Sequence, residues 1–439
     1  MFAALVLAAT LQQTLDARIE PGMGATQTRA LAVAVVKDDR VVYQRSFNAD
    51  ANTRFYLASA PKPMTALTAK LLSHDKKLDL DAPLTTTLTR LKLPAPLDPS
   101  RMSVRDLLTH RLGFESDGVG WRTSYSGDWT DDQLFSLLER HTTVTPRQFS
   151  YDNLGFILAS YAVEQAAGEP WQTTLTSRVL APAGMSSTDN RSCIETKSAK
   201  TMNRGAGGLC STLGDMTRWL RVNMTDGMLD GKRVFPLAVM REVHAPQINL
   251  QRKFGRLQRY AYGLGWYHAD YRGDVVIHHY GSYPGAWAHV SWMPDRNIGV
   301  VVLGSENNPF PDSVAMLAYD TLLGREDAGA TFDAEVQQIA GFLGRIPAMI
   351  DDFAKKFAAE SKDSDRTPAS YAGTYTNDEL GTLVIEADGR AKIGDRAATL
   401  VRVRGDAFYA RWFPLEAPER IVFGDDALTW RGRTFARRQ

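Results

Sequence analysis

The chain has 439 residues, of which 44% are hydrophobic and 23% charged, an ordinary composition for a globular protein of two or three domains. Its 51 basic and 50 acidic residues give a formal net charge of +1, which argues against a nucleic-acid partner or an anionic membrane surface. No stretch has the roughly eighteen uninterrupted apolar residues of a membrane-spanning helix, so we expect no transmembrane span.

The N-terminal residues 1–10 (MFAALVLAAT) form a short apolar stretch with small residues behind it. This stretch resembles the hydrophobic part of a secretory signal, although the basic residues that normally precede it are missing. We favour export to the periplasm or the medium, with residues 1–20 as a possible signal peptide. The alternative is a cytoplasmic chain whose first helix ends near Asp16-Ala-Arg18.

The next segment predicts a hairpin followed by a helix. Residues 31–36 and 41–47 are β-rich and lie on either side of a polar turn cluster. Good helix formers then follow from residue 59 to residue 72. The two prolines in this run fit a first helical turn, where backbone N–H groups have no intrahelical partner. We therefore expect a helix that starts at or just after Ser59.

The middle of the chain predicts further helices. Ser103 and Asp106 make an approximate capping box at the start of one of them. Residues 131–140 and 153–167 carry helical apolar spacing, and residues 211–220 form another capped amphipathic helix.

Strand patterns return over residues 275–279, 287–293 and 298–303. Strands therefore lie at both ends of this region and helices lie between them. An antiparallel sheet of the five-stranded type, made from the N-terminal hairpin and this meander and covered by helices, satisfies that order. We assign the α+β fold class.

The C-terminal part of the chain has a different texture. Residues 326–366 are charged and alanine-rich, with two predicted helices, and we interpret them as a helical connector. Residues 367–439 contain short strands separated by Gly and Asp turns, which predicts a small all-β domain of half-barrel or sandwich type. The α+β domain then occupies residues 21–325, after the N-terminal segment 1–20.

Cys193 and Cys210 are the two cysteines of the chain. Two thiols cannot make a structural zinc site without other ligands, and no histidine cluster lies near them, so we expect no metal there. In an oxidising compartment they could pair across the loop between them. The alternative is two unrelated thiols.

Ser59 and Lys62 form an S-x-x-K pair at the predicted helix start. Residues three apart share a helix face, so the hydroxyl and the amine should point the same way. The serine also lies at the positive end of the helix dipole. A hydroxyl beside an amine is one way to build an activated nucleophile. Taken alone the pair is weak evidence, because a capping serine followed by a solvated lysine gives the same pattern.

Three more patterns follow in order: Tyr151-Asp152-Asn153 before a helix, a glycine-rich segment at residues 205–212 that we interpret as structural, and His279-Tyr280-Gly281-Ser282 leaving a strand. Over about residues 25–325 the chain resembles the serine β-lactamase and penicillin-binding-protein superfamily, in the branch near class C enzymes, D-aminopeptidases and related esterases. The same resemblance includes VRDLLTH at 104–110, LAPAGMSST at 180–188, GGLCST at 207–212 and YGLGW at 262–266. The C-terminal module is similar to the lipocalin-like appendage of many members.

The resemblance implies acyl transfer without a metal or a cofactor. Ser59 would attack a carbonyl carbon and form an acyl-enzyme, which requires a base to take the hydroxyl proton. Lys62 or Tyr151 would be that base, and Tyr151 would also pass a proton to the leaving group. We interpret His110, in the Leu-Leu-Thr-His motif, as structural.

The resemblance also assigns the residues that would bind and orient substrate. Asn153 would hold the lysine amine and a substrate amide, and His279 would line the site. The backbone N–H groups of Ser59 and Ser282 would stabilise the oxyanion. Gly281 would let substrate approach the backbone closely.

The chain departs from the β-lactamase pattern on the last strand of the site. His279-Tyr280-Gly281 stands where β-lactamases have Lys-Thr-Gly, and a mostly neutral histidine is a poorer anchor for a substrate carboxylate. Strand alternation lets only one of His278 and His279 face the site, and we favour His279. Asp152 also replaces the common serine of the Tyr-x-Asn motif.

The main hypothesis is a serine hydrolase that forms an acyl-serine on esters or amides. D-amino-acid or peptidoglycan-type peptides are the favoured substrates, as for a D,D-carboxypeptidase or D-aminopeptidase, and small esters come next. The alternatives are an acyl transferase or peptide cyclase, a weak β-lactamase, and a β-lactam-binding, peptide-binding or scaffold protein without turnover. We expect a small-molecule or peptide substrate and no cofactor, and the oligomeric state stays open.

Overall fold

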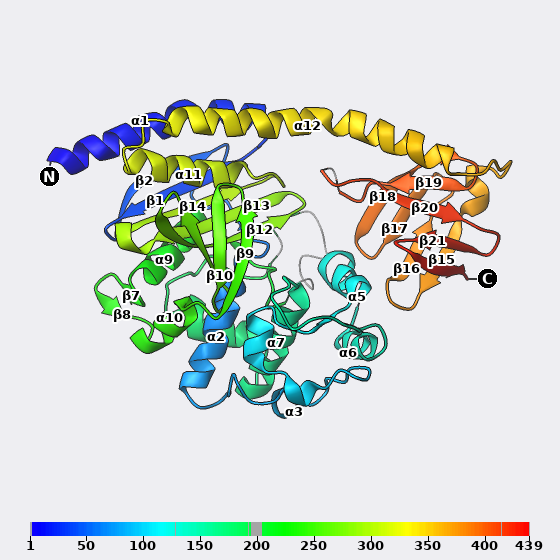
Figure 1. Ribbon diagram of the computed structural model, residues 1–439, viewed down its shortest axis with the longest axis horizontal. Helices are drawn as coiled ribbons and strands as arrows, with labels where there is room; N and C mark the ends of the chain where they lie inside the picture. Colours follow the sequence, from blue (N-terminus) through cyan, green and yellow to red (C-terminus); the bar gives the residue numbers. More distant parts are fainter. Residues whose placement is uncertain (1, 128, 192, 195–203, 414, 439) are drawn as a thin grey trace.

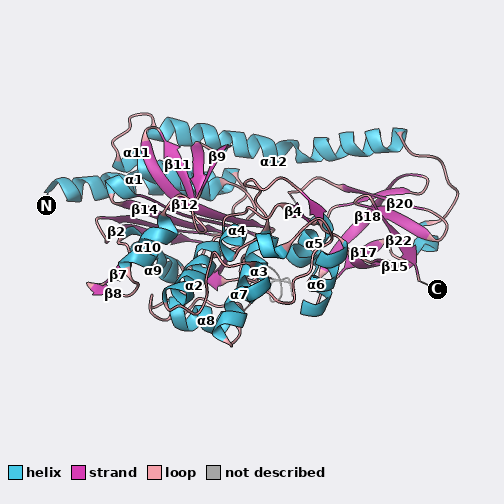
Figure 2. Cartoon of the chain, turned by 60° about the horizontal axis from the view of Figure 1, so that its bottom comes forward, coloured by secondary structure: helices cyan, strands magenta, loops and turns pink. Residues whose placement is uncertain are grey.

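The computed structural model describes residues 2–127, 129–191, 193–194, 204–413 and 415–438. A large antiparallel sheet lies between two helical layers, and a small β-barrel lies at the far end of the molecule (Figure 1). The long helix α12 (Ala328–Ala359) runs over one helical layer and on to the barrel (Figures 1 and 2). In the described part of the chain no helix combines the length and the apolar character that a membrane crossing requires.

The central sheet has eight strands among the described residues, in the order β2-β1-β14-β13-β12-β11-β10-β9. The five strands predicted from the sequence are present, and three more extend the sheet at one edge. The strands are β1 (Leu31–Lys37), β2 (Arg40–Phe47), β9 (Ile248–Phe254), β10 (Leu257–Tyr262), β11 (Tyr267–Tyr271), β12 (Asp274–Tyr283), β13 (Ala286–Met293) and β14 (Ile298–Gly304).

Both faces of the sheet are buried, so its central strands are apolar on both sides. Along β1 the even-numbered residues 32–36 pack on the helical region that carries α2, and the odd-numbered residues 31–35 pack on the opposite layer. That opposite layer consists of α1 (Phe2–Ala25), α11 (Phe310–Leu322) and the first part of α12.

Helix α1 runs to Ala25, so the predicted end near Arg18 was wrong. The helix continues because its apolar four-residue spacing continues, through the buried residues Leu11, Leu15, Ile19 and Met23. The part of α1 from Leu11 onward therefore packs as an integral layer of the fold.

The other face of the sheet carries most of the helices. They are α2 (Lys62–His74), α3 (Leu84–Thr87), η1 (Pro99–Arg101), α4 (Val104–Leu108), α5 (Asp117–Trp121), η2 (Arg122–Ser126), α6 (Asp131–Arg140), α7 (Asn153–Ala167), α8 (Trp171–Leu175), η3 (Thr176–Leu180), α9 (Leu213–Met224) and α10 (Leu237–His244). The predicted capping box of Ser103 and Asp106 is confirmed at the start of α4. Short two-stranded pairs connect them: β3 (Phe55–Tyr56) with β6 (Cys210–Ser211), β4 (Phe114–Glu115) with β5 (Thr143–Val144), and β7 (Met228–Leu229) with β8 (Lys232–Arg233).

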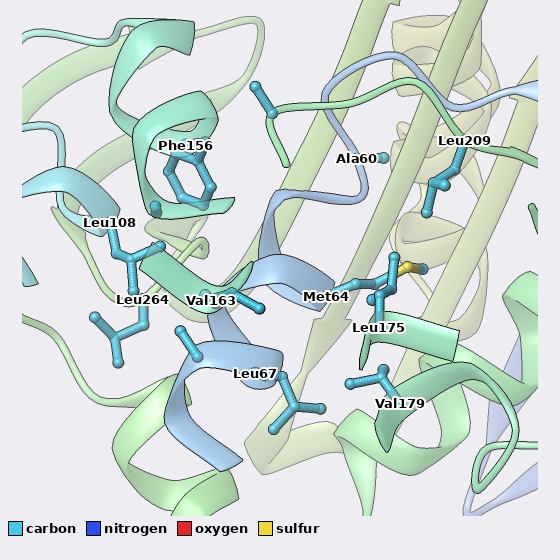
Figure 3. Close-up of a cluster of buried hydrophobic side chains, with 14 of the residues drawn as sticks. Ala60, Met64, Leu67, Leu108, Phe156, Val163, Leu175, Val179, Leu209 and Leu264 are labelled. Atoms are coloured by element: carbon cyan, nitrogen blue, oxygen red, sulfur yellow. The ribbon is translucent and has the colours of Figure 1, made fainter. Parts of the chain in front are cut away.

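Helix α2 lies at the centre of this layer. Its apolar face contacts α7 and the α8–η3 segment, with Met64 and Leu67 among buried side chains from those elements (Figure 3). The other labelled members of the cluster are Ala60, Leu108, Phe156, Val163, Leu175, Val179, Leu209 and Leu264. Full burial of a side chain of this kind contributes about 1.5–3 kcal/mol, so the start of α2 is held rigidly from several sides.

The connector forms one continuous helix, and the prediction of two helices was wrong. Pro347 lies inside α12, and buried apolar positions lie on both sides of it, at Phe332, Val336 and Leu343 before it and at Phe357 after it. The C-terminal half of α12 contacts β18 and β19 of the barrel. Two short 3-10 turns complete the described elements: η5 (Pro294–Arg296) between β13 and β14, and η6 (Pro368–Tyr371) before β15.

The C-terminal domain is a closed barrel of eight strands in the described residues, which goes beyond the half-barrel or sandwich prediction. Its strands are β15 (Gly373–Asn377), β16 (Gly381–Ile385), β17 (Arg390–Ile393), β18 (Arg396–Arg404), β19 (Ala407–Ala410), β20 (Glu419–Phe423), β21 (Ala427–Trp430) and β22 (Arg433–Arg437). Pairing of β15 with β22 closes the barrel. Closure removes the exposed strand edges that an open sheet would present.

Candidate active site

Ser59 lies in a tight turn between β3 and α2. The helix begins at Lys62, three residues later than the earliest predicted start, and the Ser59 carbonyl accepts a hydrogen bond from the Lys62 backbone N–H at 3.1 Å. Pro61 is the N-cap residue and Pro63 lies in the first turn, as expected. Ala58 has φ +47°, an unfavourable left-handed conformation for a non-glycine residue, directly before Ser59. Such strain persists only where the surrounding structure holds it.

The Lys62 amine lies inside the protein, with 0% of the residue exposed. It lies 2.9 Å from Ser59 Oγ, 2.8 Å from Asn153 Oδ1 and 2.7 Å from the Ala206 carbonyl oxygen. Burial lowers the pKa of the Lys62 amine well below its usual value, and the Asp152 carboxylate opposes that shift. Lys62 and Ser59 therefore share one face, as their spacing predicted.

Tyr151 closes the site from the start of α7. Its ring lies 4.9 Å from Lys62 Nζ, and its hydroxyl interacts with the neighbouring Ser59 side chain, which opposes the rise of the Tyr151 pKa. Burial raises the pKa of the Tyr151 hydroxyl well above its usual value, and the neighbouring tyrosines 267 and 280 add to the shift. The phenol therefore holds its proton firmly.

Asp152 caps helix α7 by accepting a hydrogen bond from the Leu154 N–H at 2.7 Å. Burial raises the pKa of the Asp152 carboxyl to about 6, although the Leu154 N–H and the Lys62 amine pull it down. The residue that replaces the common serine of the motif thus has two effects. It stabilises the helix end that presents Tyr151 and Asn153, and it places a titrating carboxyl near Lys62.

Asn153 connects the lysine to a residue that the sequence analysis did not identify. Its Oδ1 accepts from the Lys62 amine, and its Nδ2 donates to Ser124 Oγ at 3.1 Å. Ser124 lies on η2, far from every motif in the sequence. No sequence pattern distinguishes this serine, because its role depends on a contact between segments 29 residues apart.

The glycine-rich segment has a direct contact with the site besides its structural role. Gly205 has φ +69°, and a Cβ there would collide with the Phe156 carbonyl oxygen of α7. This close approach lets two successive carbonyls face α2, where Gly205 O accepts from Thr65 Oγ1 at 2.7 Å and Ala206 O accepts from Lys62. A main-chain acceptor of this kind leaves no side-chain signature in the sequence.

Gly281 brings strand β12 against the turn that carries Ser59. A Cβ at Gly281 would collide with the Leu57 carbonyl oxygen and would lie 2.8 Å from the Ser59 backbone nitrogen. The glycine is therefore required for packing between two parts of this chain, and its expected role of admitting substrate stays a prediction. The contact places the Ser59 N–H beside the strand that continues into Ser282, whose own hydroxyl donates to Asn307 Oδ1 at 2.7 Å.

A chain of hydrogen bonds with fixed directions joins both ends of the site. The Asp152 N–H donates to His110 Nδ1 at 3.2 Å, so the proton of a neutral His110 lies on Nε2, 3.2 Å from the Tyr262 oxygen. His279 Nδ1 donates to the Tyr280 carbonyl at 2.7 Å, so its Nε2 accepts from the Tyr262 hydroxyl at 3.4 Å.

Burial, with the nearby Lys62 amine, lowers the pKa of both His110 and His279 well below the usual value, so both rings are neutral. Both nitrogens of His279 are already used within the protein, which leaves that ring no spare N–H for a substrate. His278 lies on the opposite face of the strand, where its Nε2 accepts from Arg259 at 3.1 Å. Of the two neighbouring histidines, His279 is the one that faces the site.

Cys193 and Cys210 are joined by a disulfide. Cys210 belongs to β6, which pairs with the strand that leads to Ser59, and it packs in a small cluster with Tyr56, Ala58 and Tyr283. The bridge thus braces one wall beside the serine turn. In the described part of the chain, no three His, Cys, Asp or Glu side chains gather as a metal site would require.

An antiparallel sheet covered by helices, with a Ser-x-x-Lys pair at the head of a central buried helix, defines a β-lactamase/transpeptidase-like protein. The chain belongs to the Beta-lactamase family, whose profile matches residues 15–325. This family assignment covers the sheet and its helices.

Three curated relatives are similar at low identity. The Beta-lactamase of Pseudomonas fluorescens is 22% identical over 70% of this chain and 97% of its own length. The Unguisins hydrolase ungD' of Aspergillus campestris is 23% identical over 70% of this chain, which spans 62% of that relative. The D-alanyl-D-alanine-carboxypeptidase/endopeptidase AmpH of Escherichia coli is 27% identical over 36% of this chain and 45% of its own length.

Two solved structures have the same fold. The octameric penicillin-binding protein homologue from Pyrococcus abyssi has a TM-score of 0.60 at 17% identity, covering 96% of this chain and 98% of that chain. A class C beta-lactamase in complex with cefoxitin has a TM-score of 0.57 at 18% identity, covering 72% of this chain and 99% of that chain. The first likeness extends over the C-terminal barrel as well.

Proposed function

We propose that this protein is a serine hydrolase that forms an acyl-serine at Ser59 on ester or amide substrates. The observation that carries the proposal is the buried Lys62 amine, 2.9 Å from Ser59 Oγ. Within the described residues, no carboxylate lies within ion-pair distance of Lys62. Such an amine favours its neutral form, which is the form that can take a proton from the serine.

The hydrogen bonds of Lys62 support this proton transfer. A neutral amine has two N–H groups and one lone pair. Asn153 Oδ1 and Ala206 O are acceptors only, so they use both N–H groups of the neutral amine. The lone pair then faces Ser59 Oγ, which donates its proton to Lys62. The sequence alone left open which of the two candidate residues acts as the base, and this arrangement favours Lys62.

Tyr151 suits the later proton transfer to the leaving group. Its side chain lies beside Ser59 and Lys62, which suits a proton donor to a departing alkoxide or amine. Because burial raises its pKa, Tyr151 is a protonated phenol at neutral pH and acts as a donor, and Lys62 replaces the proton it gives up. The oxyanion would be held by the backbone N–H groups of Ser59 and Ser282, and the close contact of Gly281 with Ser59 supports that pairing.

We propose D-amino-acid or peptidoglycan-type peptides as the main substrate class, with small esters second. The name of one relative, the D-alanyl-D-alanine-carboxypeptidase/endopeptidase AmpH, fits this class. His279 uses both ring nitrogens internally, so the lysine anchor that serves a β-lactam carboxylate has no counterpart on β12. This disfavours efficient β-lactam hydrolysis.

The test is a panel of chromogenic substrates given to the purified full-length protein. We expect turnover of D-amino-acid p-nitroanilides and p-nitrophenyl esters, little turnover of a chromogenic cephalosporin, and none of these with Ser59→Ala. Turnover that persists in Ser59→Ala, in a preparation free of other hydrolases, would contradict the proposal.

We also propose that the protein works in an oxidising compartment, as an exported protein. The Cys193–Cys210 disulfide supports this, because disulfides persist in secreted and periplasmic proteins and are rare in the cytosol. Fractionation of the source cells tests the proposal, and recovery in the cytosol with both thiols free would contradict it.

A further inference from the structure

The C-terminal barrel has a filled interior, so its role must lie on its outer surface. An eight-stranded barrel is just wide enough for side chains to fill it. Here buried aromatic and aliphatic side chains do so, including Tyr375, Phe408, Phe423, Trp430 and Phe435. The barrel is therefore built as a rigid body, and the surface it presents to the catalytic region is the place to look for a function.

That surface meets the segment from α5 to α6, which lies beside the barrel in both views (Figures 1 and 2). The turn between β17 and β18 packs tightly against this segment. Gly394 has φ +53°, and a Cβ there would collide with the Ser126 carbonyl oxygen. The Asp395 N–H donates to the same oxygen at 3.0 Å, and Arg396 Nε donates to the Tyr125 carbonyl at 2.9 Å.

A second set of contacts joins the barrel to the other end of the same segment. Arg122 Nη1 donates to the carbonyls of Asp378 and Glu379 at 3.3 and 3.4 Å. The rings of Trp121 and Trp430 meet edge to face at 5.0 Å. Main-chain and side-chain contacts with the barrel therefore hold the helical turn η2 at both of its ends.

The inner side of η2 reaches the candidate active site. Ser124 lies between the two ends of η2 that contact the barrel, and its Oγ accepts from Asn153 Nδ2 at 3.1 Å. Asn153 in turn holds the Lys62 amine at 2.8 Å. A continuous path of contacts thus runs from the barrel through η2 and Asn153 to the residue proposed as the base.

Arg396 carries the barrel's contact further along the site wall. The residue is 6% exposed, its guanidinium lies 4.8 Å from the ring of Phe413 and 5.2 Å from that of Tyr283, and it donates to the Tyr283 hydroxyl. Tyr283 ends β12, one residue after Ser282. In the described residues no carboxylate forms an ion pair with Arg396. The burial of this cation costs free energy, and its hydrogen-bond acceptors are the Tyr125 carbonyl and the Tyr283 hydroxyl.

We propose that the C-terminal barrel is a positioning domain for the active site, and that Arg396 is its central positioning residue. Arg396 holds Tyr125 and Tyr283 together and so fixes η2 against the end of β12. This contact in turn fixes the positions of Asn153 and of Ser282, the proposed oxyanion donor on β12, relative to Lys62. This inference rests on the proposed acyl-serine function for its kinetic consequences. The contacts themselves predict a second, activity-independent effect.

The experiment compares full-length Arg396→Ala with Arg404→Ala, a matched control at the other end of the same strand, where Arg404 pairs with Asp363 at 2.8 Å. With a p-nitrophenyl ester, Arg396→Ala should lower kcat by about tenfold or more with a smaller change in KM, because misplacement of catalytic groups acts on the chemical step. Arg404→Ala should match the wild type. Arg396→Lys, which keeps the charge and the stem but loses the planar fork, should recover part of the activity.

Two further measurements keep the inference separate from the proposed function. Arg396→Ala should speed amide hydrogen exchange in residues 122–126 and at the start of α7, and Arg404→Ala should not. In a double-mutant cycle, Arg396→Ala and Ser124→Ala should combine to less than the product of their single effects on kcat. If exchange and kcat in Arg396→Ala equal those of the control, the inference is wrong even in an active enzyme. If the wild type lacks activity but the exchange difference is present, the proposed function alone is wrong.

Discussion

The main-chain oxygen of Ala206 lies 2.7 Å from the Lys62 amine, on a segment that sequence analysis assigned to structure alone. Together with Asn153 Oδ1, this oxygen accepts from the Lys62 amine, and in a neutral lysine these two acceptors would leave the lone pair for Ser59 Oγ at 2.9 Å. In the proposed mechanism, these two acceptors together direct the serine proton toward Lys62.

Replacement of Lys62 by Met should lower kcat/KM by about 10²–10⁴-fold, the usual contribution of a positioned general base. Met fills a similar volume but offers no lone pair. Steady-state kinetics with a p-nitrophenyl ester measure the effect. Lys70→Met is the control on the same helix, because Lys70 pairs with Glu242 away from the serine. An equal loss of kcat/KM in both variants would mean that the substitutions act by disturbing helix α2, and not by removing the Lys62 amine.

The pH dependence of kcat/KM should respond to Asp152. Activity requires the neutral Lys62 amine, so kcat/KM should rise with pH as the ammonium loses its proton. The Asp152 carboxylate favours the ammonium and holds the Lys62 pKa up. In Asp152→Asn, which keeps a helix cap, the Lys62 pKa should fall and the acid limb should move to lower pH. A shift to higher pH would contradict the electrostatic assignment.

Tyr262→Phe should cost stability and activity together. The Tyr262 hydroxyl bridges His110 Nε2 and His279 Nε2, so its loss leaves two buried ring nitrogens without partners. An unsatisfied buried polar group costs about 1–3 kcal/mol, which urea unfolding would detect. Tyr260→Phe on the same strand is the control, since Tyr260 is 39% exposed. Equal unfolding free energies of the two variants would show that the hydrogen bonds of Tyr262 with His110 and His279 do not stabilise the fold.

Gly281→Ala should destabilise the fold, because the added Cβ collides with the Leu57 carbonyl oxygen and crowds the Ser59 amide. Overpacking of this kind costs about 1–3 kcal/mol, and activity should fall with it. Gly344→Ala is the control, since nothing lies within 4 Å of its built Cβ, and it should be slightly stabilising within α12. A Gly281→Ala protein as stable as the wild type would contradict the packing role of this glycine, and loss of activity without loss of stability would show that substrate needs the space.

The disulfide predicts no free thiol in protein unfolded without reductant, when that protein comes from an oxidising compartment. Its two cysteines are 17 residues apart, and closing a loop of this length contributes about 3 kcal/mol. Cys193→Ser should lower the unfolding free energy by a similar amount. Two titratable thiols in the unfolded wild type would contradict the pairing.

Sequence reasoning found the residues whose positions local geometry dictates. Ser59 and Lys62 meet because they are three residues apart at a helix start, and Tyr151 and Asn153 flank the cap of α7. It missed Ser124 and Ala206, because one acts through a distant tertiary contact and the other through its main chain. It also missed strands β9–β11, of which β9 is an edge strand with mostly exposed, polar residues that lack a strand pattern.

The central claim is most directly tested by intact-mass spectrometry of the full-length protein after incubation with a fluorophosphonate. The account predicts one covalent adduct per chain on the wild type, mapped to Ser59, a much slower adduct on Lys62→Met, and none on Ser59→Ala. A folded wild-type protein that never forms the adduct, or an adduct that persists in Ser59→Ala, would contradict it.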